Sequence, residues 1–339
     1  MQRPSHVSSH RIGFVGTRFD GTDGVSLETR KWAQVLERVG QSAYYFAGVS
    51  DQPEEVSLVV PEAHFLHKDV QEIANISYRS STRPPGITRR IHELREYLKE
   101  RLYEYIRQYD LELLIAENAL SIPMHIPLGL ALTEVIVETG IPVIGHHHDF
   151  FWERKRFLDN CIGDYLEMAF PPRLPNIHHV VINSLAATEM NKRRGINVSV
   201  IPNVMDFDNP PDPPDEYTAS LRADLGVDSG EYFLLQPTRP LQRKGIEYAI
   251  ELIRRLEMNA RLVISHAGGD EGNEYVEHVR TLAGLMDVPV NFVSDIIQTQ
   301  RGTTRDGHKI YTLGDVYPQA DLVTFPSLLE GFGNAFLES

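Results

Sequence analysis

Two carboxylates near the end of the sequence, Glu330 and Glu338, flank a glycine-containing turn with seven residues between them. The apolar run 320–325 predicts a buried parallel strand before them, and 331–334 predicts the start of a helix. Backbone N–H groups at a helix start lack intrahelical partners and suit a phosphate or a sugar hydroxyl. With Glu330 on the loop and Glu338 about two helical turns on, the carboxylates would lie about 10 Å apart, the scale of a nucleotide sugar. The alternative is a helix cap at Glu330 and a solvated Glu338.

A second set of chemical groups, Arg239 and Lys244, follows the predicted strand 232–236 and precedes the predicted helix 246–256. Two fixed cations beside a helix N-terminus suit a diphosphate. Arg243 is adjacent to Lys244 and could take its place. The competing interpretation is a basic cluster on the surface with no ligand.

Three consecutive histidines, His146, His147 and His148, come directly after the predicted strand 141–145. Strand carboxyl ends are where doubly wound sheets bind ligands. Alternate side chains of an extended chain face opposite ways, so at most His146 and His148 could share a metal ion. No second His or Cys group follows at ligand spacing, and the sequence therefore predicts no metal site.

Composition excludes several classes of function. The chain has 339 residues, with 33 Lys and Arg against 47 Asp and Glu, a net charge of −14. An acidic balance disfavours non-specific binding to nucleic acid and to anionic membranes. The single cysteine, Cys161, fits a reducing compartment, and residues 1–10 lack the apolar centre of a signal peptide. We therefore expect a cytoplasmic protein without an integral membrane segment.

Strands and helices alternate along the whole chain, which predicts an α/β fold of two Rossmann-like domains. The first domain is predicted at 1–206, a Pro- and Asp-rich linker at 207–230, and the second domain at 231–339. Strands are predicted at 11–16, 43–47, 111–116, 141–145, 179–183, 198–201, 232–236, 260–265, 288–293 and 320–325, and helices at 26–39, 87–109, 127–139, 184–195 and 246–256. A glycine loop before the first helix contains Gly24, which is either a backbone contact for a phosphate or only a turn residue.

The stretch 326–338, Pro-Ser-x-x-Glu-Gly-Phe-Gly-Asn-x-x-x-Glu, resembles the E-x7-E motif of retaining glycosyltransferases of family 4, which have the GT-B fold. The resemblance implies two Rossmann-like domains facing each other across a cleft, with the donor bound by the second. It gives Glu330 a contact with the donor hexose and Glu338 the ribose hydroxyls. It also places four backbone positions near the sugar and the diphosphate: Phe332, Gly333, Asn334 and Ala335.

Other positions take their roles from the same resemblance. Arg239 and Lys244 would bind the pyrophosphate of the donor, and Gly24 would lie against its phosphates. His148 would contact the transferred sugar or the acceptor. Three residues that follow it would line the acceptor side: Asp149, Trp152 and Arg156.

The implied reaction moves a hexosyl group from a nucleoside diphosphate sugar to a hydroxyl of a small soluble acceptor, with the anomeric configuration retained. Fixed cations would stabilise the departing diphosphate without a metal or other cofactor. Two alternatives stay open: a non-catalytic nucleotide-sugar-binding protein of the same fold, and a sugar-nucleotide epimerase. The family continues beyond its second Glu, whereas this sequence ends one residue after Glu338, so we expect an incomplete second domain.

Overall fold

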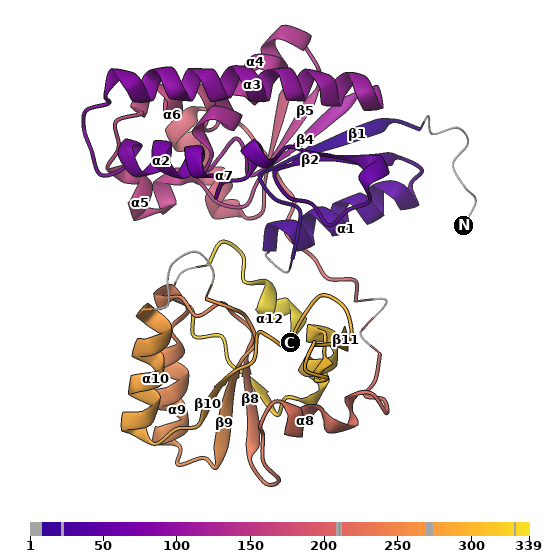
Figure 1. The fold of residues 1–339 in the computed structure, drawn as a ribbon, viewed down its shortest axis with the longest axis vertical. Coiled ribbons are helices and arrows are strands. Elements are labelled where there is room, and N and C mark those ends of the chain that lie inside the picture. The colour runs from indigo at the N-terminus through magenta and orange to yellow at the C-terminus, as the bar shows by residue number, and fades with distance from the viewer. Residues whose placement is uncertain (1–8, 22–23, 208–209, 211, 269–273, 329) are drawn as a thin grey trace. The chain divides into compact units, whose positions relative to one another are not determined.

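The computed structural model describes residues 9–21, 24–207, 210, 212–268, 274–328 and 330–339 (Figure 1). The chain divides into two compact units, Met1–Asn203 and Val204–Ser339. The sequence also predicts a glycine loop at 266–270, after the predicted strand 260–265, and this segment lies partly outside the described residues, as does Leu329 of the C-terminal motif.

The first unit is built on a seven-stranded sheet in the order β3-β2-β1-β4-β5-β6-β7. All neighbouring pairs are parallel, so the carboxyl ends of the strands lie along one edge of the sheet. The strands are β1 (Arg11–Val15), β2 (Ser42–Ala47), β3 (Ser57–Val59), β4 (Leu113–Glu117), β5 (Val143–His147), β6 (Ile177–Val181) and β7 (Ser199–Val200).

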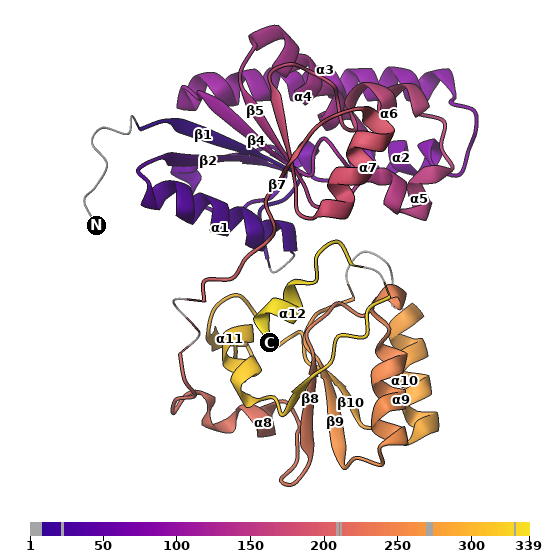
Figure 2. The same ribbon diagram turned by 180° about the vertical axis from the view of Figure 1, so that it is seen from behind.

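Helices cover both faces of this sheet (Figures 1 and 2). They are α1 (Gly24–Arg38), α2 (Lys68–Ser77), α3 (Pro85–Tyr109), α4 (Ile126–Thr139), α5 (Lys155–Leu158), α6 (Gly163–Ala169) and α7 (Ser184–Arg194), with short 3₁₀ turns at Glu54–Val56, Pro61–Ala63 and Phe151–Glu153. On one face α3 and α4 pack through buried leucines such as Leu98 and Leu132. On the other face α1 packs through Ala33 and Trp32.

Side-chain alternation along the strands assigns each residue to one of these faces. In β4, Leu114 and Ala116 join the core under α3 and α4, whereas Ile115 joins the core under α1. By the same alternation Glu117, the last residue of β4, lies on the α1 face. This placement decides the surroundings of the candidate site.

The second unit has a parallel four-stranded sheet in the order β10-β9-β8-β13. Its strands are β8 (Tyr232–Gln236), β9 (Ala260–Ile264), β10 (Val290–Phe292) and β13 (Leu322–Val323), and β11 (Gly302–Thr303) pairs with β12 (Lys309–Ile310) as a separate hairpin. Its helices are α8 (Leu221–Asp224), α9 (Ile246–Arg255), α10 (Glu274–Met286), α11 (Leu313–Val316) and α12 (Asn334–Glu338), with 3₁₀ turns at Thr218–Ser220, Gln242–Lys244 and Tyr317–Gln319. Figures 1 and 2 show α9 and α10 on one side of the sheet and α8 on the other.

Parallel sheets covered by helices in both units confirm the predicted α/β class of two Rossmann-like units. The expected linker 207–230 differs from the structure, because Leu221, Leu225 and Val227 are buried in the core of the second unit. Only the Pro- and Asp-rich beginning of that range has the composition of a linker, and the apolar residues after it begin the next core. No helix in the described part of the chain combines the length and the apolar character needed to cross a membrane.

Candidate functional site

In the first unit, a carboxylate and two imidazoles meet where β4 and β5 end. The parallel register pairs Glu117 with His146, and β5 continues two residues beyond the predicted strand end at 145. An oxygen of Glu117, Oε2, lies 3.0 Å from Nδ1 of His146 and 3.2 Å from Nε2 of His148. The side chains of Glu117 and His146 are fully buried, and that of His148 is 9% exposed.

Charge pairing governs the ionisation of this cluster. Burial alone would raise the pKa of Glu117, but the two imidazoles outweigh it and lower the pKa to about 2. Burial alone would lower the pKa of His148, but the hydrogen bond and charge of Glu117 raise it, with smaller contributions from Asp149 and Glu28. The carboxylate is therefore held ionised in an apolar setting by its imidazole neighbours.

The turns after β4 and β5 are fastened to each other by one side chain. Asn118 has a φ of 57°, a left-handed conformation that asparagine tolerates. Its Oδ1 accepts a 2.9 Å hydrogen bond from the backbone N–H of His148, and its Nδ2 donates to Asp149 at 2.9 Å. Asp149 also pairs with Arg154. The predicted residues His148 and Asp149 are thus held by Asn118, a residue that the sequence reading did not single out.

Trp32 of α1 packs against the cluster of Glu117, His146 and His148 on the face of the sheet that α1 covers. Its ring stacks on the ring of His146 with centroids 4.3 Å apart and planes 29° apart. Glu28, one turn earlier on the same helix, is buried and pairs with Lys31 at 3.2 Å. The α1 face of the strand ends therefore carries an aromatic wall and a second buried carboxylate.

The middle histidine belongs to a different environment on the opposite face of the sheet. Nε2 of His147 lies 2.8 Å from Nδ1 of His179, and Nε2 of His179 bonds the carbonyl oxygen of Pro172 at 3.1 Å. Gly145 makes room for this pair, since a Cβ there would lie 3.0 Å from the His147 ring. Burial lowers the pKa of His179 to about 4 and that of His147 well below its usual value. Both act as neutral packing residues.

Two residues expected on the acceptor side pack against their neighbours. Trp152 stacks on Phe150 with ring centroids 4.5 Å apart and joins the small core under α7. Arg156 lies over the ring of Phe157 at 4.6 Å. Gly24 is the first residue of α1 and is exposed. A role for these three residues stays a prediction.

In the second unit, cations gather beside Glu330 after β8. Lys244 forms an ion pair with Glu330, and Arg243 lies 3.5 Å from its other oxygen. Nε2 of Gln236, the last residue of β8, donates to the carbonyl of Lys244 at 3.0 Å. Gly245 takes a left-handed φ of 62°, and a Cβ there would lie 2.5 Å from the carbonyl oxygen of Pro326. Glycine is required for this close approach of the two loops.

Arg239 is the cation of this group that has no carboxylate partner among the described residues. Its charge acts on a neighbouring histidine: burial, with smaller contributions from the charges of Arg239 and Lys244, lowers the pKa of His266 to about 4. Burial also lowers the pKa of Lys244, an effect that Glu330 partly offsets while Arg243 and Arg239 add to it. We call Arg239, Arg243, Lys244 and His266 the basic cluster.

The C-terminal motif folds close to this cluster. The backbone N–H of Leu328 donates to the carbonyl of Arg243 at 2.8 Å. Gly333 takes a φ of 96°, and α12 then begins at Asn334 and spans five residues. Glu338 accepts a 2.8 Å hydrogen bond from the hydroxyl of Tyr317. Neither Glu330 nor Glu338 is thus merely solvated, and the predicted helix is a single short turn.

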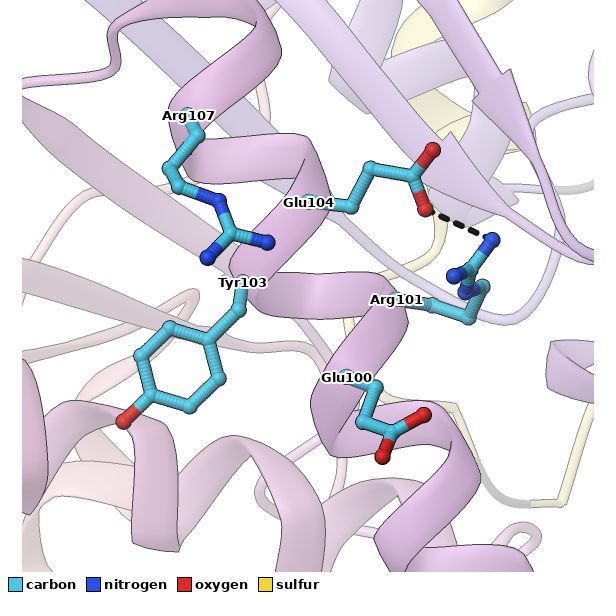
Figure 3. A pocket seen from close by; sticks show the side chains of 5 residues that line it. All are labelled: Glu100, Arg101, Tyr103, Glu104 and Arg107. Atoms are coloured by element: carbon cyan, nitrogen blue, oxygen red, sulfur yellow. Dashed lines mark ion pairs between the residues drawn. The ribbon is translucent and has the colours of Figure 1, made fainter.

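A surface hollow elsewhere carries none of these features. Figure 3 shows side chains that spread outward from α3. The lining residues all come from that one helix: Glu100, Arg101, Tyr103, Glu104 and Arg107. An open depression on one solvated helix lacks the converging groups of a binding site.

Sequence comparison connects these features to known proteins. No protein-family model matches the chain. Mannosylglucosylglycerate synthase from Petrotoga mobilis is 32% identical over 351 residues, covering 97% of this chain and 79% of the relative. The synthase of the same name from Thermotoga maritima is 31% identical over 356 residues, covering 97% of this chain and 78% of the relative. The chain belongs to the mannosylglucosylglycerate synthase family.

Solved structures agree with this family assignment at the level of the fold. Sucrose-phosphate synthase from Thermosynechococcus elongatus aligns with a TM-score of 0.65 and 14% identity, covering 97% of this chain and 78% of that one. HepE from Anabaena, solved with UDP-glucose, aligns with a TM-score of 0.63 and 14% identity, covering 97% and 77%. This family member is a glycosyltransferase with the GT-B fold. Membership of family 4 and the roles of the E-x7-E residues stay predictions.

Proposed function

We propose that this synthase-family member transfers a hexosyl group from a nucleoside diphosphate sugar to a hydroxyl of a small soluble acceptor, with retention of configuration. The name shared by its relatives supports mannosyl as the transferred group and glucosylglycerate as the acceptor. We assign diphosphate binding to Arg239 and Lys244, the donor hexose to Glu330 and the ribose to Glu338.

The observation that carries the donor assignment is the excess of positive charge after β8. Arg239 lacks a carboxylate partner in the described part of the chain, and the charges of Arg239 and Lys244 add to burial in lowering the pKa of the nearby His266. A diphosphate would offset this repulsion between like charges and gain charge-assisted hydrogen bonds.

The chemistry follows from the same charges. As the glycosidic bond to the diphosphate breaks, negative charge builds on the leaving oxygens, and fixed cations stabilise that charge without a metal. The acceptor hydroxyl attacks on the face that the diphosphate leaves, and a diphosphate oxygen takes its proton, so that configuration is retained. We assign His148 to hydrogen bonding with the transferred sugar or the acceptor, with Asp149 beside it. Backbone groups from Phe332 to Ala335 are assigned to the donor.

The test is a donor and acceptor screen on the purified chain. GDP-, UDP- and ADP-hexoses are incubated with glucosylglycerate, and the products are followed by mass spectrometry and proton NMR. The proposal predicts one hexose added per acceptor, with an anomeric coupling that matches the donor. Binding of nucleotide sugar without any product would favour a non-catalytic role, and an inverted anomeric signal would contradict the retaining mechanism.

A further inference from the structure

The cluster of Glu117, His146 and His148 has the composition and spacing of a metal centre. Each residue offers one ligand atom, and these atoms all lie within 4.8 Å of one another. Two imidazoles and one carboxylate are a recurrent ligand set for Zn²⁺ and related divalent ions, which leaves a fourth position open. The two histidines alone are not such a set, and the neighbouring strand supplies its third member.

The separations between the ligand atoms fit one ion. Bonds of about 2.0–2.1 Å in a tetrahedral site place neighbouring ligand atoms about 3.3 Å apart. Oε2 of Glu117 lies 3.0 Å from Nδ1 of His146 and 3.2 Å from Nε2 of His148. Two of the three separations between ligand atoms are thus already close to the required value. The partly exposed side chain of His148 is the one that can move to adjust the third.

Charge in the surroundings favours a cation at this point. Of the carboxylates near His148, Glu28 pairs with Lys31 and Asp149 pairs with Arg154. Glu117 has no Lys or Arg partner among the described residues and faces only imidazoles. A buried carboxylate needs compensating positive charge, which either protons on the imidazoles or a metal ion can supply.

Groups outside the trio hold the two imidazoles in place, while Nε2 of His146, the ring nitrogen that would not face the ion, is buried without a hydrogen bond to any described residue. Trp32 stacks on the same ring and fixes its plane. The backbone N–H of His148 is held by Asn118, so the two imidazoles are oriented by groups outside the trio.

We propose that Glu117, His146 and His148 bind one divalent transition-metal ion of the Zn²⁺ class. Mg²⁺ and Ca²⁺ prefer oxygen ligands and are not expected to bind here. The bound ion replaces the protons that the trio shares and occupies the ring nitrogen of His148. Since the proposed transfer needs no metal and assigns His148 to a substrate, occupancy of the site should inhibit transfer; this consequence alone rests on the proposed function.

The experiment uses the untagged full chain after treatment with a chelator. Co²⁺ is titrated while visible absorption is recorded, and Zn²⁺ affinity is measured by competition with a chromogenic chelator. One Co²⁺ per chain with the intense bands of a four-coordinate site, displaced by Zn²⁺ and unaffected by Mg²⁺, is the expected result. Zn²⁺ should also raise the melting temperature, since it binds the folded chain.

Variants locate the ion. Glu117→Gln and His148→Gln should each weaken Zn²⁺ affinity by at least about 100-fold, since each removes a direct ligand. His178→Asn is the matched control, because His178 lies on β6, is exposed, and bonds Ser199 instead. Circular dichroism checks that each variant folds. Octahedral-type weak absorption, a stoichiometry well below one, or equal affinity in both ligand variants and the control would overturn the site. The effect of these substitutions on hexosyl transfer activity is not used to judge whether the metal site exists.

Discussion

The carboxyl ends of the two parallel sheets carry charged clusters with opposite balances. In the first unit, Glu117 is enclosed by His146 and His148 and has no Lys or Arg partner among the described residues. In the second unit, one described carboxylate, Glu330, stands among the cations of the basic cluster. Protons on the imidazoles or a bound metal ion can balance the negative charge of the first cluster. The second cluster carries more positive than negative charge.

Burial explains why the clusters differ in what they can bind. Glu117 is fully buried, so its charge is compensated by groups in direct contact. Glu330 is 20% exposed and Lys244 is 13% exposed, so water and mobile ligands reach this pair. The same fold element, a parallel strand end, therefore carries a closed cluster in one unit and a more exposed cationic cluster in the other.

The largest effect is expected on donor affinity, when positive charge is removed from the basic cluster. In the double variant Arg239→Ala/Lys244→Ala, two charge-assisted contacts to the diphosphate are lost, at about 2 kcal/mol each, so donor affinity should fall about 1,000-fold. Calorimetry with nucleoside diphosphates measures the affinity. Circular dichroism should stay unchanged, because neither side chain belongs to the hydrophobic core.

The control for this variant is Arg255→Ala. Arg255 is an exposed cation in the last turn of α9 and pairs with Glu251 at 2.5 Å. Its removal changes the net charge of the unit but not the basic cluster, so donor affinity should change less than twofold. Equal losses in the double variant and this control would mean that general charge, and not the basic cluster, attracts the donor.

The second prediction concerns stability and tests whether the buried charge of Glu117 matters to the first cluster. Glu117→Gln in the metal-free protein leaves two buried imidazoles without their carboxylate, and loss of one partner of a buried pair costs about 3 kcal/mol. Both tryptophans, Trp32 and Trp152, lie in the first unit, so urea unfolding followed by tryptophan fluorescence reports on that unit.

Glu138→Gln provides the comparison within the same unit. Glu138 is 43% exposed and pairs with Lys99 at 2.5 Å. An exposed pair contributes at most about 1 kcal/mol, so this change should have a small effect. If both substitutions cost the same, Glu117 is a packing residue whose charge does not matter.

Much of the fold was predictable because parallel strands are short apolar runs followed by helices with an apolar face. The strands at β1, β4, β8 and β9 were predicted nearly at their observed bounds. The elements α5, α6 and the hairpin of β11 and β12 were not, since segments of two to seven residues are too short to show a period, and the longer helices α2 and α10 were also missed. The core residues Leu221 and Leu225 were assigned to a linker because prolines and aspartates dominate the residues before them.

Residues of the candidate sites were predictable only where a pattern within one short segment of the sequence identified them. Arg239, Lys244 and Glu330 were recognised from local patterns, and the structure brings Lys244 and Glu330 into contact. Glu117 and Asn118 were missed, because their importance depends on which strand lies beside β5. The signal was present in the sequence, since Glu117 and Asn118 directly follow the predicted strand 111–116, and neighbouring parallel strands end at one edge.

The third effect concerns buried histidines of the first unit. His125 caps α4, and burial lowers its pKa to about 4, with a smaller contribution from His67 and His64. The unfolded chain therefore binds a proton at His125 near pH 6.5, and the folded chain does not until pH 4. Stability is highest above pH 6.5 and falls as pH drops, with about 2 kcal/mol lost at pH 5 from this group.

His125→Asn removes the titration and keeps a side-chain acceptor for the cap at Leu128. Urea unfolding at pH 7 and pH 5, followed by tryptophan fluorescence, should show a smaller acid loss in the variant than in the unaltered chain. An identical loss in both proteins would assign the acid sensitivity to other groups, of which His147 and His179 are the candidates.

A smaller effect separates the ion pair that Glu330 makes with Lys244 from its proposed contact with the donor hexose. Glu330→Gln frees Lys244 and Arg243 from their carboxylate, so affinity for a bare nucleoside diphosphate should hold or rise slightly. Turnover should fall about tenfold or more, because the proposed contact to the transferred hexose is weakened only where the sugar is present. Steady-state kinetics and calorimetry on the same preparation give both values. A fall in diphosphate affinity with unchanged turnover would mean that the roles of Glu330 and Glu338 are exchanged.

The smallest effect uses His266 as an internal reporter of the basic cluster. Its low pKa has two sources, burial and the charges of Arg239 and Lys244, whereas the pKa of His125 owes nothing to Lys or Arg. A bound diphosphate or the substitution Arg239→Ala should therefore raise the pKa of His266 and leave that of His125 unchanged. Proton–nitrogen NMR of labelled histidine side chains across pH 4 to 7 measures both, and mutation of each histidine to Asn assigns the signals. An unchanged His266 titration on diphosphate binding would place the anion elsewhere, and the contrast between an open cationic cluster and a closed imidazole cluster would then lose its functional meaning.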